Sequence, residues 1–369
     1  MNDRSAPRKL SFADLNLQSV ATSSGAAVVI AILASLVILG PLLMLAGVSV
    51  GEGYSVLFGA SIGSSYGFTS LLLSSTPLLV TGIGVTLAYR SGMVNVGGDG
   101  QILVGAVAAV LLFPAVSGMP GVLAVAMMMI LGGLAGGAWG LIAGVLKKWR
   151  SVNEIISTIM LNILAALLVQ YLVAGPLKGD GLQYAATDNA PLSSWLGNVA
   201  FGSLRVPVGF IVALLILSAV SAVTHYTGWG WRQRVTGLSA PLALRQRVNV
   251  PTMYMNSLLL SGAFAGIAGV LELLGNQHRV GQEFTPGWGF YALAVALLAR
   301  GRFPAVLPLV LYIGALLNGS GSLQSELALS GNFVQLLVGL PVVATAALIG
   351  YVDYAPRRRS DRKFRTKAA

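Results

Sequence analysis

The sequence predicts an all-α, polytopic membrane protein with about ten transmembrane helices and both termini on the cytoplasmic side. Three observations carry this prediction. Hydrophobic residues make up 55% of the 369 residues and charged residues only 9%, against roughly 25% charged residues in soluble domains. The apolar residues form long continuous runs, whereas a β-barrel would show short alternating segments. The basic residues, finally, are sorted by loop.

Ten apolar segments are candidate membrane spans, because a helix needs about 20 residues to cross roughly 30 Å of hydrocarbon. The third, eighth and ninth are short by this measure, so they tilt little, lie partly inside the bundle or are broken helices. The first is too long for the apolar core of a signal peptide, so we expect it to be retained. The segments are 26–48, 68–89, 101–116, 121–146, 154–175, 207–226, 252–274, 286–299, 303–318 and 332–351.

The distribution of Lys and Arg sets the orientation, because these residues stay cytoplasmic near the ends of spans. With the N-terminus inside, 20 of the 23 basic residues fall in cytoplasmic segments, and only Lys178, Arg205 and Arg279 lie outside. The predicted organisation is a cytoplasmic tail at 1–25, a transmembrane domain at 26–351 and a basic cytoplasmic tail at 352–369.

Composition also excludes several chemistries. The chain has no Cys, and its two histidines, His225 and His278, are far apart in sequence, so we expect no metal site. A P-loop requires Lys followed by Ser or Thr, and no Lys here is followed by either. The net charge of +11 lies mostly in short loops and the C-terminal tail, so it indicates orientation and not binding to nucleic acid. We therefore expect no cofactor on this chain and no enzymatic activity.

Glycines recur every four residues in the fourth segment. This spacing places them on one helix face, where a neighbouring backbone can approach closely. Packing within the subunit is favoured, and a subunit interface is the alternative. The four residues are Gly132, Gly136, Gly140 and Gly144.

Three acidic residues lie in or beside apolar runs, where lipid would penalise a charge. Asp99 follows a glycine-rich turn, so capping of the third segment and a functional role are about equally supported. Glu154 starts the fifth segment, where the helix dipole favours a carboxylate, and it forms one polar stripe with Thr158 and Asn162. Glu272 snorkels, pairs with Arg279 or lines a pathway.

The loop at 227–251 contains a short helix signature. Ser239 suits the cap, Pro241 suits the first turn, and the segment from Pro241 to Arg247 ends in basic residues. Such a helix docks a cytoplasmic partner or rests on anionic lipid headgroups. The residues alone do not decide between these interpretations.

Two motifs resemble the permease subunits of bacterial ABC importers, in the superfamily of ribose and branched-chain amino acid permeases. The segment from Thr81 to Gln101 ends in Asn-Val-Gly-Gly-Asp-Gly-Gln, and the segment 153–162 reads Asn-Glu-Ile-Ile-Ser-Thr-Ile-Met-Leu-Asn. Both are similar to signatures of the nucleoside and simple-sugar branch. The segment from Arg234 to Val250 resembles that branch's coupling segment, although it lacks the usual Asn-Pro-x-Ala-Ala run, and Ala299 replaces a usual Gly.

The resemblance implies a transport subunit of the bacterial inner membrane that works by alternating access. It implies a cytoplasmic ABC ATPase that binds ATP and Mg, a second permease subunit or a second copy of this chain, and an extracytoplasmic solute-binding lipoprotein. The ATPase contacts would be Arg234, Gly237, Ser239, Pro241, Leu244, Arg245 and Arg247. The translocation pathway would use Asn95, Asp99, Gln101, Glu154, Thr158, Asn162, Glu272 and Trp288.

The expected solute is a purine-type nucleoside, and a simple sugar such as ribose or galactose is the alternative. An ion-coupled secondary transporter with Asp99, Glu154 or Glu272 as proton relay is less favoured, because such folds often show inverted repeats and none is evident. An intramembrane enzyme lacks the needed residues. A receptor or scaffold is not excluded by composition.

Overall fold

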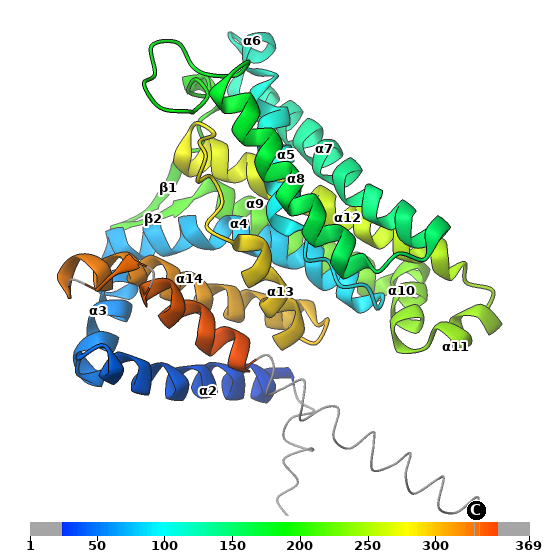
Figure 1. Cartoon of the computed structure of the whole chain (residues 1–369), viewed down its shortest axis with the longest axis horizontal. Coiled ribbons are helices and arrows are strands. Elements are labelled where there is room, and N and C mark those ends of the chain that lie inside the picture. The colour runs from blue at the N-terminus through cyan, green and yellow to red at the C-terminus, as the bar shows by residue number, and fades with distance from the viewer. Residues whose placement is uncertain (1–23, 328, 332, 346–369) are drawn as a thin grey trace, which may run out of the picture.

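The computed structural model describes residues 24–327, 329–331 and 333–345, and this part of the chain is mostly helical (Figure 1). The prediction of a helical, multi-span membrane protein is confirmed. The predicted tails at 1–25 and 352–369 lie almost entirely outside the described residues. Seven helices are long and apolar enough to cross a membrane: Val28–Leu45, Ser65–Arg90, Gly121–Arg150, Glu154–Ala174, Val208–Tyr226, Val250–Gln277 and Phe303–Glu326.

Two further apolar helices are shorter than a full span. Helix α5 (Gly98–Val110) and helix α13 (Trp288–Leu298) fall in the third and eighth predicted segments, which were expected to be short. The tenth predicted segment is described only in part, as the apolar helix Phe333–Thr345. Short apolar helices inside a bundle are typical of broken membrane helices, whose ends must find partners within the protein.

The ninth predicted segment is longer than we expected from the sequence. Helix α14 runs from Phe303 to Glu326, 24 residues, past the polar stretch that begins at Asn318. That stretch stays helical because helix α3 (Val50–Ile62) accepts it: Asn318 donates to Ser61 Oγ over 3.2 Å. Gly319 lies so close to α3 that an added Cβ would sit 2.1 Å from the Leu57 carbonyl oxygen. The polar and glycine-rich composition of this stretch resembles that of a loop, but here it allows α14 to pack closely against α3.

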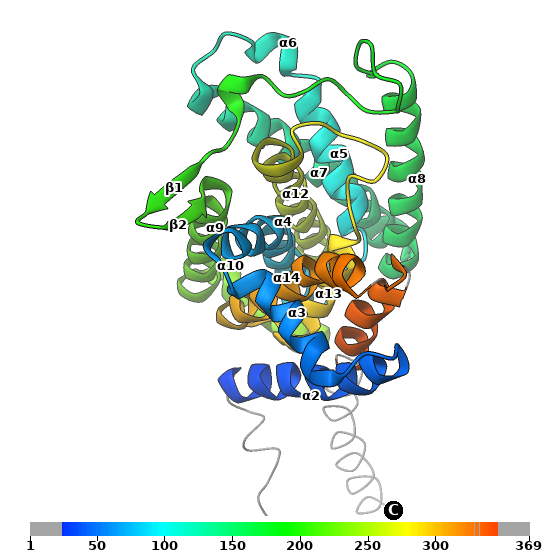
Figure 2. The same ribbon diagram turned by 90° about the vertical axis from the view of Figure 1, so that its left-hand side faces the viewer.

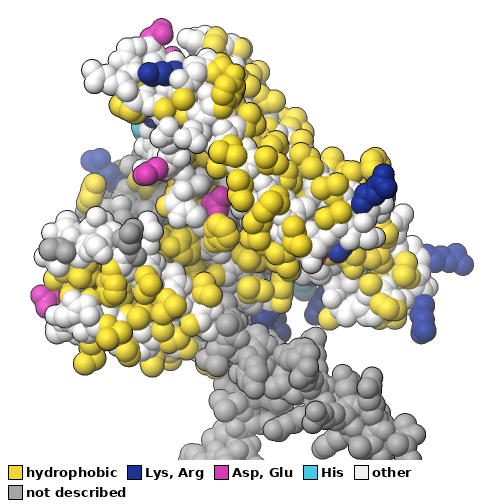
Figure 3. Space-filling view, viewed as in Figure 1, with side chains coloured by type: hydrophobic (Ala, Val, Ile, Leu, Met, Phe, Trp, Pro, Cys, Tyr) yellow, Lys and Arg dark blue, Asp and Glu magenta, His cyan; other side chains and the backbone are white. Residues whose placement is uncertain are grey.

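Helix α4 (Ser65–Arg90) is the centre of the bundle. In an 18-residue apolar stretch of α4, 89% is buried inside the molecule. In the corresponding stretches of α8 (Glu154–Ala174) and α9 (Val208–Tyr226), only 28% is buried. α4 packs against α12 (Val250–Glu272), α13 and α14. In Figure 3 hydrophobic side chains cover the outer surface near α7 and α8 and near α2 (Ser24–Leu45), as a lipid-facing surface requires.

The glycine stripe of α7 (Gly121–Arg150) packs against α12, in the largest helix contact of the described chain. A Cβ at Gly136 would sit 2.5 Å from the Gly262 carbonyl oxygen, and one at Gly266 would sit 2.1 Å from the Gly132 carbonyl oxygen. Small residues on both helices allow this backbone contact. We call it the glycine seam.

Opposite ends of the helices carry different connections (Figure 1), and Figure 2 shows the molecule from the side of the hairpin. One end has the short helix α6 (Phe113–Val116), the 3₁₀ turn η2 (Leu192–Ser194) and a two-stranded antiparallel hairpin, β1 (Asn198–Phe201) with β2 (Leu204–Pro207). The other end has α10 (Gly228–Leu238) and α11 (Ala240–Arg245), where basic side chains gather (Figure 3). The sequence predicted a short helix where α11 lies but predicted neither α10 nor α3.

Candidate functional site

The chain between α4 and α5 is the first element of the site. α4 ends at Arg90, the chain turns at Gly92 with a φ of 88°, and α5 begins at Gly98. Asn95, fully buried in this turn, donates from Nδ2 to Gln101 Oε1 over 2.9 Å and to Ser261 Oγ of α12 over 2.8 Å. Its Oδ1 accepts the Gly97 backbone N–H. Asn95 thus fixes the turn before α5 to α12.

Helix α8 holds the same turn from the other side. Asn162 accepts the Gly100 N–H over 2.8 Å and donates to the Val96 carbonyl over 2.8 Å. Thr158 accepts the Val96 N–H over 3.3 Å. These contacts satisfy backbone groups at the start of α5 that the helix cannot satisfy itself. We call Asn95, Gln101, Thr158, Asn162 and Ser261 the polar clamp.

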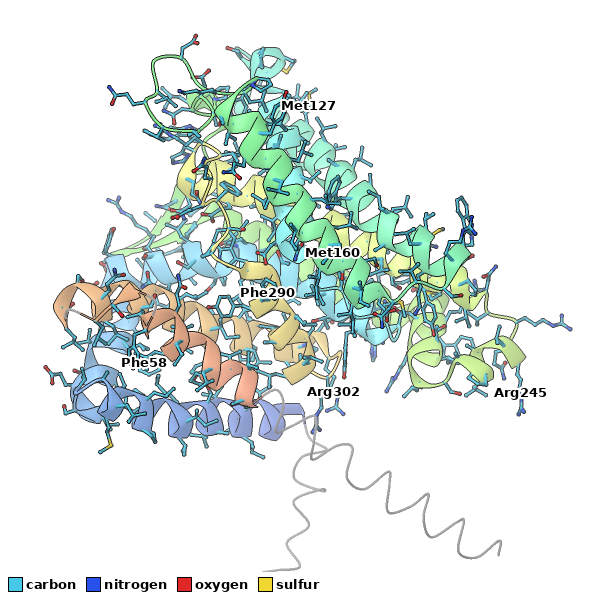
Figure 4. The ribbon with its side chains drawn as sticks, viewed as in Figure 1. Phe58, Met127, Met160, Arg245, Phe290 and Arg302 are labelled. Carbon is cyan, nitrogen blue, oxygen red and sulfur yellow. The ribbon has the colours of Figure 1, made fainter. Side chains whose placement is uncertain are left out.

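The starts of α5 and α13 meet directly. Asp99 accepts the Gly289 N–H through Oδ1 over 3.0 Å, and a Cβ at Gly98 would sit 2.7 Å from the Gly289 Cα. Asp99 therefore occupies the N-terminus of α13 as well as the first turn of α5, where the helix dipole favours its carboxylate. Its second oxygen, Oδ2, is buried and has no hydrogen-bond partner within the described residues. Trp288 is buried beside this contact, whereas Phe290 is exposed (Figure 4).

Glu272 lies at the end of α12, where the helix continues as the π-helical turn η3 (Leu273–Gln277). Its side chain is 1% exposed and accepts from Asn276 over 2.7 Å and from Gln277 over 3.0 Å. It neither snorkels nor pairs with Arg279, which donates to Tyr184 instead. The π turn brings residues 276 and 277 back toward the carboxylate, which the sequence spacing does not reveal.

Glu154 forms an ion pair with Lys147 at the end of α7, with 2.8 Å between Nζ and Oε2. The cap of α8 is Asn153, whose Oδ1 accepts the Ile155 N–H over 2.8 Å. Asn153, and not Glu154, therefore caps α8, while Glu154 lies in the first turn of the helix. Glu154 joins α7 to α8 and stands apart from the polar clamp.

The predicted loop at 227–251 folds as two consecutive helices, α10 and α11, which we call the elbow, and it presents α11 outward. Ser239 caps α11 by accepting the Leu242 N–H over 3.4 Å. Leu242 and Leu244 are 46% and 59% exposed, and Arg245 projects from the end of the molecule (Figure 4).

Helix α10 fastens this elbow to the core. Gln233 is fully buried and donates to the Leu87 carbonyl of α4 over 2.7 Å. Gly237 packs so closely that a Cβ would sit 2.2 Å from the Arg90 carbonyl oxygen. Sequence analysis missed Gln233, although Gly230, Gln233 and Thr236 recur every three residues and are all buried. A search for apolar faces does not find such a polar packing face.

A cavity of about 820 Å³ opens beside this junction, between the end of α4, the end of α9, α10 and the turn from α13 to α14. We call it the basic cavity. Sequence analysis did not anticipate it. Its lining residues are Tyr89, Arg90, Gly92, Val94, Ser221, His225, Arg234, Gly237, Leu238, Arg300, Gly301, Arg302, Phe303 and Pro304.

Among the described residues, no group of three or more His, Asp or Glu is placed to hold a metal ion. The site instead combines broken helices that meet inside the bundle, a carboxylate between them, and a helical elbow joined to the central helix. This arrangement suits a moving membrane pathway.

Comparison with known proteins decides the family. The model of the branched-chain amino acid transport system permease component matches residues 67–346. The chain belongs to this permease family. The permease is 30% identical over 325 residues to a glucose ABC transporter permease of Haloferax volcanii, with 85% of each chain covered. It is 30% identical over 315 residues to a guanosine ABC transporter permease of Bacillus subtilis, covering 84% of this chain and 89% of that one.

A nucleoside ABC transporter permease of Lactococcus lactis is 26% identical over 329 residues, covering 85% of this chain and 87% of that one. The predicted resemblance is therefore confirmed. The permease is the membrane component of an ABC importer, so ATP hydrolysis takes place on another subunit and solute reaches it from a binding protein. This membership decides against the ion-coupled transporter and against the scaffold.

Proposed function

We propose that this permease moves purine-type nucleosides into the cytoplasm of a bacterium by alternating access across the inner membrane. It spans the membrane with ten segments and has both termini inside. It pairs with a second permease subunit or a second copy of itself, and a lipoprotein delivers the solute. The observation that carries the solute is the similarity to guanosine and nucleoside permeases over most of the chain.

The geometry around Asp99 supports a polar solute with N–H or O–H donors. The buried Oδ2 atom of Asp99 has no partner in the described chain, and a buried unpaired acceptor costs about 1–3 kcal/mol. A guanine N–H pair or a ribose hydroxyl would satisfy it. Trp288 begins the helix that Asp99 caps, and an aromatic ring there suits a nucleobase. We propose Asp99 and Trp288 as the residues that contact solute.

The other predicted pathway residues have different surroundings. Asn95, Gln101, Thr158 and Asn162 use all their side-chain polar atoms within the polar clamp. Their place in the pathway, and that of Glu154 and Glu272, stays a prediction. A role through the clamp is compatible with transport, because the clamp sets the position of α5 and hence of Asp99.

In this proposal the ATPase contacts α11 and moves it. The exposed leucines and Arg245 of α11 form the contact, and α10 passes the motion to α4 through Gln233 and Gly237. Because α4 contacts α12, α13 and α14, a displacement of its end moves the turn before α5. The predicted coupling residues therefore divide between an outer contact on α11 and an inner joint at Gly237.

A simple sugar is the second candidate solute, favoured by the 30% identity to the Haloferax volcanii glucose permease. Sugar hydroxyls would satisfy Asp99 Oδ2 equally well, so the site alone does not separate the two. Uptake separates them. The complex, captured through a tag on this chain and reconstituted with ATP in liposomes, should take up labelled guanosine. ATP-dependent uptake of glucose or ribose without guanosine uptake would replace the nucleoside with the sugar.

Orientation has an independent test, because the chain lacks Cys. Gln246→Cys follows α11 and Asn198→Cys lies on β1, and both residues are exposed. In intact cells a membrane-impermeant maleimide should label Asn198→Cys and spare Gln246→Cys. The reverse pattern would refute the proposed orientation.

Asp99→Asn tests the solute contact while keeping the bond to Gly289, because an amide oxygen also accepts. We expect guanosine uptake to fall about tenfold with assembly intact, which corresponds to roughly 1.4 kcal/mol. Glu283→Gln, an exposed acid in the loop before α13, is the matched control. Equal uptake by both variants would remove Asp99 from the pathway.

A further inference from the structure

The basic cavity concentrates positive charge. Four arginines and one histidine line it, and none of the lining residues that the structure describes is Asp or Glu. Arginines that only set membrane orientation extend into water or lipid headgroups. Here four of them, from three different parts of the chain, border one hollow.

Arg90 is held in place within this wall. Its Nη2 donates to the Thr224 carbonyl over 3.3 Å, and its guanidinium carbon lies 5.8 Å from the centre of the Phe303 ring. Its Nε is buried and has no hydrogen-bond acceptor in the described part of the chain. A fixed guanidinium with an unused donor is preorganised for an anion, because little side-chain freedom remains to be lost on binding.

Arg234 reaches the same cavity from α10, and its charge repels that of Arg90. An anion between them would relieve this repulsion. Gly92 and Gly301 turn the chain in this wall, with φ values of 88° and 71° that other residues rarely adopt. These turns bring the ends of α4 and α13 to the same cavity.

A phosphate group matches these features. A phosphate monoester carries about −1.5 to −2 charges and three strong acceptor oxygens, and Arg binds it through two parallel hydrogen bonds. A carboxylate has one charge and fits several arginines less well. The volume of about 820 Å³ lies within the roughly 300–1,000 Å³ typical of sites for small molecules. Tyr89 and Phe303 add aromatic wall to a space larger than phosphate alone.

We infer that the basic cavity binds a phosphate-bearing molecule on the cytoplasmic side, in contact with Arg90 and Arg234. The cytoplasmic placement rests on the proposed function. A bound phosphate bridges the end of α4 to α10, the two elements that pass motion from the ATPase. Such a ligand therefore holds the elbow against the core. The phosphate comes either from a soluble nucleotide or from a lipid headgroup.

Two arms of one experiment separate these sources. The complete complex, with its ATPase sites saturated with MgADP, is placed in nanodiscs of phosphatidylcholine and titrated with GMP and with inorganic phosphate. Guanosine, which lacks phosphate, is the matched ligand. In the second arm, phosphatidylglycerol is added to the nanodiscs and retained lipid is counted by native mass spectrometry. Saturable GMP binding indicates the soluble source, and retained phosphatidylglycerol indicates the lipid.

Variants assign the binding to the cavity. Arg234→Gln, an exposed position that folding should tolerate, and Arg90→Gln should each weaken phosphate binding about tenfold. Arg205→Gln, an exposed arginine on β2 far from the cavity lining, should leave it unchanged. The inference would be overturned if the complex bound none of GMP, phosphate and phosphatidylglycerol. It would also be overturned if all three variants bound phosphate equally well. Binding without guanosine uptake would refute the proposed solute and leave this site standing.

Discussion

The polar clamp and the basic cavity are neighbours in sequence, yet their polar side chains have opposite surroundings. Those of the clamp are paired by hydrogen bonds, and those of the cavity are like charges around an open space. The clamp begins at Asn95, and the cavity includes Arg90 only five residues earlier. Every side-chain nitrogen and oxygen in the clamp has a hydrogen-bond partner. The cavity holds like charges, about 820 Å³ of space and an Arg90 Nε that has no hydrogen-bond acceptor among the described residues.

This difference indicates two kinds of work. A fully paired polar cluster in a membrane protein fixes the position of backbone that a helix leaves unsatisfied. Charges of one sign around an open space instead prepare a surface for a ligand. Changes in the clamp should therefore act on stability, and changes near the cavity and the elbow should act on binding and coupling.

The largest effect should come from removing a clamp residue. Asn162→Leu leaves the Gly100 N–H and the Val96 carbonyl buried without partners, and each costs about 1–3 kcal/mol. We expect a clear loss of thermal stability in detergent and reduced yield. Gln170→Leu, an exposed polar-to-leucine change on the same helix, is the control. A wild-type melting temperature for Asn162→Leu would show that the clamp contributes no rigidity.

The glycine seam lies next to the clamp, because Gly140 of the seam is close to the side chain of Gln101. A Cβ at Gly140 would sit 2.6 Å from the Leu258 carbonyl oxygen and 3.0 Å from Gln101 Nε2. Gly140→Ala should therefore separate α7 from α12 and lower stability by about 1–3 kcal/mol, as overpacking does. Gly59→Ala in α3, where nothing lies within 4 Å, should be neutral or slightly stabilising, because Ala favours helix. Equal melting curves for the two variants would contradict a tight seam.

Substitutions on the exposed side of the elbow should change transport and not stability. Replacing Arg245 and Arg247 together with Gln removes two exposed charges without disturbing the core. We expect transport per ATP hydrolysed to fall several-fold in liposomes while the melting temperature stays unchanged. Normal coupling in this double variant would place the ATPase contact outside α11.

The smallest effect belongs to Glu154. Its ion pair with Lys147 is partly exposed, with 12% and 27% of the two side chains accessible, and such pairs contribute about 0.2–1 kcal/mol. A double-mutant cycle of Glu154→Gln and Lys147→Gln should give a coupling energy in that range. A drop in uptake far beyond this stability change would instead support the predicted pathway role.

Sequence reasoning found the membrane class, the short third and eighth segments and the family, because apolar run length and motif spacing are local properties. It found Asn95, Thr158 and Asn162 as unusual polar residues but not their task. It missed α3, α10 and the full length of α14. Glycine and serine that allow close packing against another helix are also typical of loops, and the sequence alone does not distinguish the two cases. It also missed Gln233, which donates to a backbone carbonyl 146 residues away.

The amino-acid sequence by itself determined that this chain lives in a bilayer, since hydrocarbon accepts only long apolar helices with their backbone groups satisfied. It also determined the permease family through two short motifs. Only the tertiary structure decided which polar residues face one another and which face open space. Pairing depends on where α8, α12 and α13 bring their side chains, and those distances are set by helix packing and not by position along the chain.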